Sequence, residues 1–148
     1  MTFIPDFQIP SNEPATALWF IYARGKLLVK IRNDTCSIPE TADLAEYHTA
    51  LIHKQYLGTL DNRPCYAAEI DSEALKQTGL EFRDLRSLFG VLDENLIWVA
   101  GRANQLINWN RIHQYCGSCG EPTEFKTDER AKICRQCGLT NYPRLSPA

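Results

Sequence analysis

The sequence has 148 residues, a formal net charge of −2, a hydrophobic fraction of 44% and a charged fraction of 23%. These values are typical of a folded soluble protein and exclude an intrinsically disordered chain. The length allows one ordinary domain plus a small appendage, and the charge gives no overall attraction to nucleic acid or to anionic membranes.

The amino-terminal stretch MTFIPDFQIP has neither the basic nor the apolar region of a signal peptide, and the longest apolar run is interrupted at Arg24. We therefore expect no membrane span and a cytoplasmic location. In such a reducing compartment, paired cysteines hold metal more often than they form disulfides.

Two β-hairpins are the first elements that the sequence predicts. Residues 17–23 and 26–31 are rich in aliphatic, aromatic and β-branched side chains, and they flank a polar turn at Arg24-Gly25. In the loop that follows, residues 41–47 suggest a short helix. Residues 53–60 and 65–70 predict a second hairpin, with residues 61–64 as its turn.

Two helices are expected after the second hairpin. Residues 81–92 predict a short helix that stops near Gly90. A longer helix is predicted from about residue 93 to 113, with Asp93 as its N-cap and one apolar stripe that faces a sheet. This stripe comprises Leu96, Val99, Ala100, Ala103, Leu106, Ile107 and Asn110. The expected fold is therefore α+β, with packed helices on a mixed or antiparallel sheet.

Four of the six cysteines form two C-x-x-C-G pairs with fourteen residues between them. The spacing within a pair lets two thiolates from one tight turn converge on a metal, and the following glycine allows the backbone to turn. The pattern predicts a small zinc ribbon with the ligands Cys116, Cys119, Cys134 and Cys137. Because four thiolates leave no open position for water, the zinc is expected to be structural.

Other interpretations of the cysteines are disulfides, a thioredoxin-type redox pair and a rubredoxin-like iron site. Disulfides need an oxidising compartment, a redox pair needs one motif in a βαβ setting, and an iron site normally brings more aromatic residues, so zinc is favoured. His113 is a fifth candidate ligand, although a helix-terminal histidine that packs or hydrogen bonds with the ribbon is the favoured interpretation. Cys36 and Cys65 are expected to be buried structural thiols.

A zinc ribbon by itself fits two classes of function, a nucleic-acid-binding module or a spacer and dimer brace inside an enzyme. Residues 111–148 carry six Lys and Arg against four Asp and Glu, so four thiolates with one divalent cation bring this region to about zero charge. Only Phe125 and Tyr142 offer aromatic faces beyond the first cysteine pair. Both observations favour the enzyme.

The segments VAGRANQLINWNRIHQYCGSCG and NYPRLSPA, with the second cysteine pair between them, span residues 99–148. This order of motifs is similar to that of the NADH pyrophosphatase branch of the Nudix hydrolases: A-x-x-L-x-x-W, then H-x-[FY]-C-x-x-C-G, C-x-x-C and Y-P-R-x-x-P. The matching residues are Ala103, Leu106, Trp109, His113, Tyr115, the four cysteines, Tyr142, Pro143, Arg144 and Pro147. Asn110 departs from the histidine that is common after the tryptophan in the family. The first 90 residues resemble the family's degenerate Nudix-like domain only in length and hairpin content.

The resemblance implies a hydrolase that cleaves the pyrophosphate of NADH or NAD to nicotinamide mononucleotide and AMP, and that in some members removes NAD caps from RNA. It also implies a homodimer and a Nudix box, G-x5-E-x7-R-E-x2-E-E, which binds Mg²⁺ or Mn²⁺. No glycine of this sequence has a Glu six positions later, and no R-E-x-x-E-E run is present. We therefore expect no catalytic residue and no activity in this chain alone, and we expect it to be the amino-terminal part of a longer enzyme.

The expected organisation is a Nudix-like domain over residues 1–112, a zinc ribbon over 113–141 and a lead-in to the catalytic domain over 142–148. The resemblance places Tyr142 near the nucleotide site, as a substrate contact across a dimer or as a residue that packs between ribbon and catalytic domain. Arg144 faces a phosphate or solvent, with solvent favoured, and Trp109 and Tyr115 are expected to pack the helix against the ribbon. Direct nucleic-acid binding is not expected. The alternative function is a zinc-ribbon module that binds nucleic acid or protein without enzymatic activity.

Overall fold

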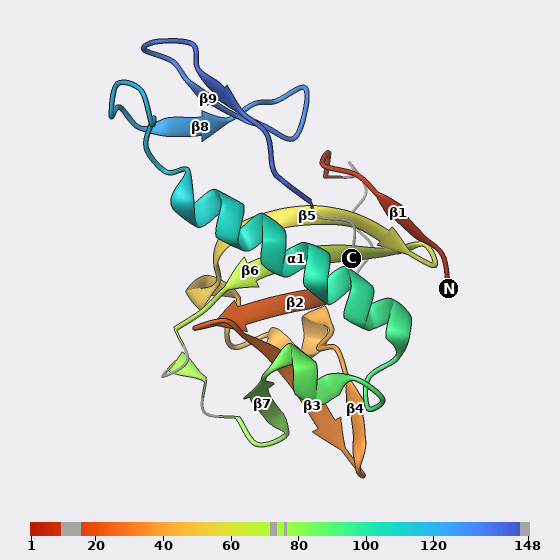
Figure 1. Ribbon diagram of the computed structural model, residues 1–148. Helices are drawn as coiled ribbons and strands as arrows, with labels where there is room; N and C mark the ends of the chain where they lie inside the picture. The colour runs from red at the N-terminus through yellow and green to blue at the C-terminus, as the bar shows by residue number, and fades with distance from the viewer. Residues whose placement is uncertain (10–15, 72–73, 76, 146–148) are drawn as a thin grey trace. The chain divides into compact units, whose positions relative to one another are not determined.

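The computed structural model describes residues 1–9, 16–71, 74–75 and 77–145. Its contacts divide the chain into two compact units, Met1–Asn104 and Gln105–Ala148, and helix α1 (Glu94–Ile112) contributes residues to both. Figure 1 shows the order of the elements along the chain. Each unit is described by itself below. Pro147, the last residue of the Y-P-R-x-x-P motif, and the end of the expected lead-in lie outside the described residues.

The first expected hairpin is confirmed. Strand β2 (Leu18–Ala23) is buried along its whole length, and β3 (Lys26–Arg32) pairs with it antiparallel through Tyr22↔Leu27 and Ala23↔Lys26. The two turn residues, Arg24 and Gly25, both have positive φ angles, 51° and 79°. This is the left-handed backbone of a two-residue hairpin turn, which suits the twist of the flanking strands.

The second hairpin is also confirmed, but its turn is shorter than expected. Strands β5 (Ile52–Leu60) and β6 (Arg63–Glu69) are joined by Asp61 and Asn62 alone, with φ angles of 49° and 66°. Arg63 and Pro64 are already paired with Leu60 and Thr59 in the sheet. Asp-Asn tolerates the left-handed conformation at both positions, so no further turn residue is needed.

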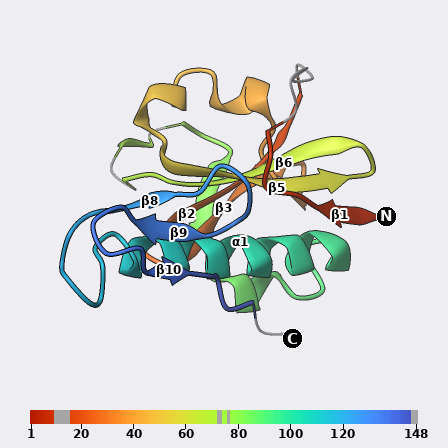
Figure 2. The same ribbon diagram turned by 90° about the horizontal axis from the view of Figure 1, so that it is seen from above.

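These strands form one mixed sheet with the order β1-β5-β6-β2-β3-β4, and a further strand, β7 (Leu80–Arg83), pairs with β3. Strands β1 (Phe3–Pro5) and β4 (Thr35–Ser37) are short. β2 and β6 run parallel in the middle of the sheet, and every other pair is antiparallel. The expected fold class is thereby confirmed (Figures 1 and 2).

The prediction of one helix over residues 81–92 is wrong in its first part. Leu80–Arg83 is the strand β7, which is followed by the 3₁₀ helix η4 (Leu85–Leu88) and by Gly90 with a φ of 80°. The alternation of apolar and polar residues in Leu80-Glu81-Phe82-Arg83 is the signal for a strand that the prediction missed. Antiparallel pairing with residues 27–30 of β3 decides in favour of the strand.

Helix α1 confirms the longest predicted element and its N-cap. The Asp93 Oδ1 accepts a hydrogen bond of 2.9 Å from the backbone N–H of Asn95, which is the contact expected of a capping carboxylate. The Tyr22 hydroxyl of β2 donates to the carbonyl oxygen of Ala100 at 2.6 Å and so fixes the first half of the helix on the sheet. Most of the predicted apolar stripe is buried, namely Val99, Ala100, Ala103, Leu106, Ile107 and Asn110, with Leu96 half-buried.

The other face of the sheet is covered by two 3₁₀ helices, η1 (Thr41–Leu44) and η2 (His48–Ala50), where one short helix was expected (Figure 2). Trp19 lies beneath them, stacked on Tyr66 with ring centroids 4.7 Å apart, and its Nε1 donates to the Thr41 Oγ1 at 3.2 Å. Among the described residues, no helix has both the length and the apolar character needed to cross a membrane.

Candidate metal centre and the adjoining groove

The ribbon in the Gln105–Ala148 unit is a three-stranded antiparallel sheet. Strands β8 (Thr123–Phe125), β9 (Lys132–Cys134) and β10 (Thr140–Asn141) are ordered β10-β9-β8. The first cysteine pair precedes β8; in the second pair, Cys134 is the last residue of β9 and Cys137 lies between β9 and β10. The hairpin therefore carries one pair at the start of its first strand and the other at the end of its second strand.

The two cysteine turns have the same backbone hydrogen bonds. The first cysteine of each pair donates its N–H to the carbonyl five residues later, from Cys116 to Glu121 at 2.7 Å and from Cys134 to Leu139 at 2.9 Å. The glycine four residues after it donates back to the cysteine carbonyl, at 2.9 Å in the first turn and 2.8 Å in the second. Gly120 and Gly138 have φ angles of 82° and 81°, which explains why each C-x-x-C is followed by glycine.

These matched turns bring the four cysteine sulfurs together, all within 4.8 Å of one another. The Sγ atoms of Cys116 and Cys137 are 3.5 Å apart, and so are those of Cys119 and Cys134. A tetrahedral zinc with Zn–S bonds of about 2.3 Å requires sulfurs about 3.8 Å apart, whereas a disulfide requires about 2.05 Å. The cysteines are free thiols in a geometry that fits a tetrahedral ion.

The electrostatics of the cluster also fit a cation. The backbone N–H groups of Cys119 and Ser118 lower the pKa of Cys116 to about 6 by hydrogen bonding to its thiolate. At Cys119, the N–H of Glu121 favours the thiolate, but the neighbouring sulfurs and burial outweigh it and raise the pKa to about 12. Thiolates at this distance repel one another, and a bound divalent cation would offset that repulsion.

His113 lies directly after α1, and its side chain bonds to the helix, whereas only its backbone carbonyl bonds to the ribbon. Its Nδ1 lies 2.7 Å from the carbonyl oxygen of Trp109, which requires the proton to be on Nδ1, and its own carbonyl accepts from the Thr123 hydroxyl of β8. The only metal-type cluster found among the described residues contains the four cysteines and does not include His113.

Asn110 and Lys132 form a contact between helix and ribbon that the sequence did not suggest. Both are nearly fully buried, and the Lys132 Nζ donates to the Asn110 Oδ1 at 2.8 Å while it lies 4.9 Å from the centroid of the Phe125 ring. Trp109 packs near the same ring, with centroids 6.0 Å apart. Trp109 therefore packs the helix against the ribbon, as expected, and Asn110 serves as the acceptor for a buried ammonium group.

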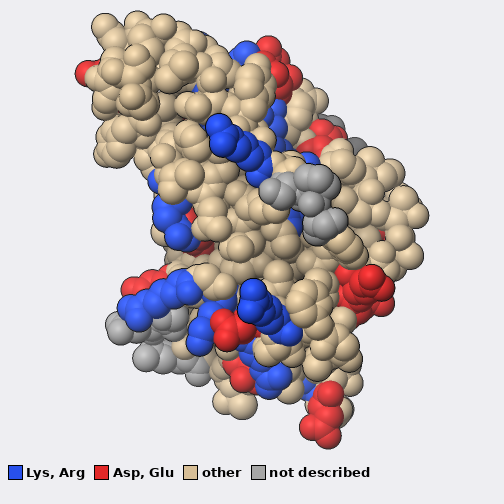
Figure 3. Space-filling model, viewed as in Figure 1, with Lys and Arg blue, Asp and Glu red and all other residues tan. Residues whose placement is uncertain are grey.

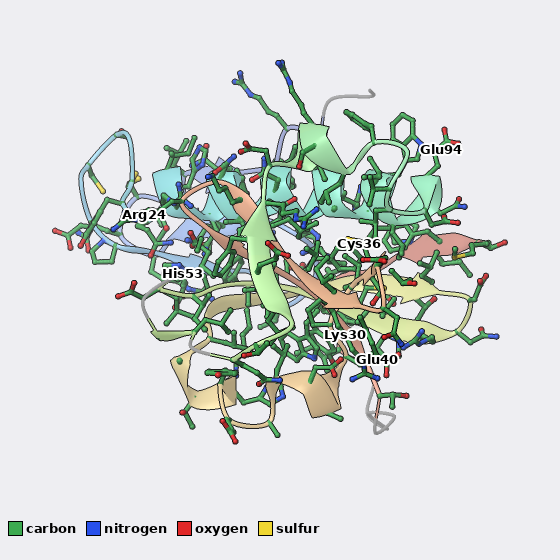
Figure 4. The ribbon with its side chains drawn as sticks, turned by 90° about the horizontal axis from the view of Figure 1, so that it is seen from below. Arg24, Lys30, Cys36, Glu40, His53 and Glu94 are labelled. Carbon is green, nitrogen blue, oxygen red and sulfur yellow. The ribbon has the colours of Figure 1, made fainter. Side chains whose placement is uncertain are left out.

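Three further expectations can be compared with the structure. Tyr115 is 67% exposed, so the prediction that it packs against the ribbon is wrong; its backbone is bridged to Pro122 and its ring is left in solvent. Cys65 is fully buried as expected, and burial raises its pKa to about 12. Cys36, which lies on β4 and is labelled in Figure 4, is only half-buried, so the expectation that it is buried is wrong.

Beside the ribbon, the same unit contains a groove of about 620 Å³. One wall is the end of α1, including Asn108 and Trp109, and the other is the segment of residues 140–144, with Tyr142 and Arg144. Tyr142 is 55% exposed, and its hydroxyl donates to the Glu129 Oε2 at 3.2 Å. The structure thus brings the predicted contact residue Tyr142 next to the end of α1.

The chain matches two domain families in succession. Residues 16–109 match the NADH pyrophosphatase-like rudimentary NUDIX domain, and residues 111–142 match the NADH pyrophosphatase zinc ribbon domain. The chain belongs to the NADH pyrophosphatase family. The mixed sheet with its helix is the rudimentary NUDIX domain, and the ribbon with its four-cysteine cluster is the zinc ribbon that holds a structural zinc.

Relatives within the NADH pyrophosphatase family are hydrolases named NAD-capped RNA hydrolase NudC. The protein from Deinococcus radiodurans is 39% identical over 146 residues, which is 99% of this chain and 48% of that protein. The proteins from Stutzerimonas stutzeri and Pseudomonas fluorescens are 38% and 39% identical over 98 residues, 66% of this chain and 35% of each of them. The chain therefore spans about half the length, or less, of the relatives that it matches.

Proposed function

We propose that this chain is the amino-terminal and zinc-ribbon portion of a Nudix hydrolase that cleaves the pyrophosphate of NADH or NAD to nicotinamide mononucleotide and AMP. The succession of two NADH pyrophosphatase domain matches carries this proposal. Removal of NAD caps from RNA is proposed as part of the same activity, because the relatives are named for it. We place the enzyme in the cytoplasm and expect a homodimer.

The zinc of this unit is proposed to be held by Cys116, Cys119, Cys134 and Cys137. Their sulfur spacing supports this assignment, and four thiolates leave no coordination position for a water nucleophile. The ion therefore stabilises a short segment that has few core residues of its own. The catalytic Mg²⁺ or Mn²⁺ is proposed to bind a Nudix box outside this sequence, where it would polarise the pyrophosphate.

Tyr142 is proposed to contact the substrate of the whole enzyme, across a dimer. Its ring is exposed while its hydroxyl end is held by Glu129, which also accepts from the Lys126 Nζ at 2.7 Å. An aromatic face fixed in this way is available for a flat ring such as a nicotinamide or an adenine. Packing against the catalytic domain is the competing role.

The alternative of a nucleic-acid- or protein-binding module without an enzyme is less well supported. It would account for the ribbon but not for the match of residues 16–109 to the rudimentary NUDIX domain. On the face drawn in Figure 3, basic and acidic side chains are mixed. A protein that binds nucleic acid typically has a continuous basic surface instead.

Product release tests the proposed function. The chain of residues 1–148 and a longer protein that also carries a Nudix box would each be incubated with NADH and Mg²⁺, and nicotinamide mononucleotide and AMP would be quantified. We expect both products from the longer protein only, because no Nudix box lies within this sequence. Turnover by the 148-residue chain would contradict the proposal, and so would a longer protein that leaves NADH and NAD intact.

A further inference from the structure

The four cysteines of the ribbon differ in their exposure to solvent. Cys119 and Cys137, the second cysteine of each pair, are exposed. Cys116 and Cys134, the first of each pair, are buried, with exposed fractions of 5% and 0%. Three of the four cysteines are followed directly by a glycine, namely Gly117, Gly120 and Gly138. A Cβ added at any of these glycines would meet no described atom within 4 Å beyond its chain neighbours, so a small solute can approach the turns from solvent.

Each exposed cysteine lies close to the buried cysteine of the other turn. The Sγ of Cys137 is 3.5 Å from that of Cys116. The Sγ of Cys119 is likewise 3.5 Å from that of Cys134. A disulfide has an S–S bond of about 2.05 Å, so each of these pairs needs to close by only about 1.5 Å. The ribbon thus contains two cross-turn pairs, each with one exposed and one buried cysteine.

Zinc ligation requires these cysteines in their reactive form. A cysteine binds zinc as the thiolate, and the thiolate is also the form that a peroxide oxidises. Oxidation is favoured at thiolates that are accessible to solvent and that have a second cysteine nearby, with which a disulfide can form. Cys119 and Cys137 meet both conditions.

We propose that the ribbon is a peroxide-sensitive switch, in which the exposed cysteine of one turn is oxidised and forms a disulfide with the buried cysteine of the other turn. The resulting disulfides are Cys116–Cys137 and Cys119–Cys134. Each disulfide removes two of the four zinc ligands, so the ion is released and the ribbon loses the cross-link that substitutes for a core. This step requires only the ribbon and a peroxide, so it is independent of the hydrolysis proposed above.

The oxidation proceeds in two balanced steps. The thiolate of the exposed cysteine attacks one oxygen of hydrogen peroxide, the O–O bond breaks, and a sulfenic acid and a hydroxide ion form. The thiolate of the buried cysteine then attacks the sulfenic sulfur, so that the S–S bond forms and the S–O bond breaks with loss of a second hydroxide. The two thiolates lose two electrons, the peroxide gains two, and two protons from solvent convert both hydroxides to water. A dithiol reverses the change by thiol–disulfide exchange.

Zinc release and peptide mapping test the switch on the zinc-loaded 148-residue chain. We expect hydrogen peroxide to release one zinc per chain, as measured with a chromogenic chelator, and a dithiol with added zinc to restore the site. Trypsin cleaves between the two turns and also after Arg135, which separates Cys134 from Cys137. Cross-turn disulfides would therefore join residues 112–126 to residues 133–135 and 136–144. Disulfides within each C-x-x-C would leave residues 112–126 unlinked.

Trapping of the sulfenic acid with dimedone tests the order of oxidation. Adducts should be about fivefold or more abundant at the two exposed cysteines than at the two buried ones, because oxidation follows exposure. The matched control is Cys36→Ser, which removes a half-buried cysteine of β4 that lies outside the cluster. This variant should release zinc at the same rate as the parent chain.

The proposal is overturned if peroxide leaves the zinc bound, or if zinc is released and no disulfide forms. It is also overturned if residues 112–126 are recovered unlinked with an internal disulfide, because each turn would then be oxidised separately. Dimedone adducts mainly at Cys116 and Cys134, or slower zinc release from Cys36→Ser than from the parent chain, would overturn it as well.

Discussion

At the scale of single residues, local backbone geometry decides what each polar side chain does. The glycines after the two cysteine pairs take left-handed conformations, and the N–H groups of each turn then face the sulfurs or the cysteine carbonyls. Asp43 also bonds to a backbone N–H within one turn. It accepts from the N–H of Glu40 at 2.8 Å and so closes the first turn of η1. A carboxylate that caps a turn in this way is held in its charged form.

Asp43 therefore contributes stability that depends on pH. Partial burial raises its pKa, but the Glu40 N–H and the Lys30 ammonium group outweigh burial and lower the pKa below its ordinary value of 3.8. Because the folded-state pKa is the lower one, this contribution is complete above about pH 5 and is lost as the pH falls below 3.8 and through the folded-state pKa. Lys30 is labelled in Figure 4.

Asp43→Asn tests this contribution. We expect a loss of about 1 kcal/mol in the free energy of unfolding at pH 7, because the amide cannot replace the ionic contact with Lys30. At pH 3 the variant and the parent protein should differ less. Urea unfolding at several pH values measures this difference, and an equal loss at pH 3 and pH 7 would show that the carboxylate charge has no part in it.

At the scale of elements, close approaches between backbones determine which strands can pair. Gly58 of β5 faces Pro5 of β1, and a Cβ at this position would lie 2.8 Å from the Pro5 Cα, 2.9 Å from the Asp6 N and against the Ile4 carbonyl. Its φ of 130° is also unfavourable for other residues. The edge strand β1 therefore depends on one glycine in its neighbour.

Gly58→Ala is expected to destabilise the protein by at least about 2 kcal/mol, because β1 must move away from β5. Gly101→Ala is the matched control in α1, where a new Cβ has no atom within 4 Å and the helix is already regular. This second change should stabilise the protein by about 1 kcal/mol through the higher helix propensity of alanine. Thermal unfolding of both variants measures the two effects, and the same sign for both would refute the argument.

At the scale of the whole molecule, the chain consists of two compact units with different sources of stability. The first unit buries a large apolar core on both faces of its sheet, including Phe20, Leu28, Leu57 and Trp19. The ribbon has few buried apolar side chains, and its four cysteine sulfurs lie within 4.8 Å of one another. The metal should therefore stabilise one unit and not the other.

Metal removal tests this division. With a chelator, we expect the backbone amides of β8, β9 and β10 to lose protection from hydrogen exchange, while those of β2, β5 and β6 keep it. Cys119→Ser should lower the zinc content of the purified protein and produce the same pattern. Cys36→Ser, which changes a cysteine outside the cluster, should retain one zinc per chain. Simultaneous loss of protection in both units would contradict the expectation that the metal stabilises only the ribbon.

The sequence by itself determined the two hairpins, the long helix with its Asp93 cap and the four-cysteine ribbon, because these features depend on neighbours within a few residues or on a fixed ligand spacing. It also showed the resemblance to the family, because the order of the motifs can be read from the sequence without knowledge of the fold. Only the tertiary structure decided that residues 80–83 form a strand, because their partner on β3 is about fifty residues away in the sequence. It alone revealed the buried contact of Asn110 with Lys132, the exposed ring of Tyr115 and the groove beside the end of α1, because each depends on which distant side chains share a space.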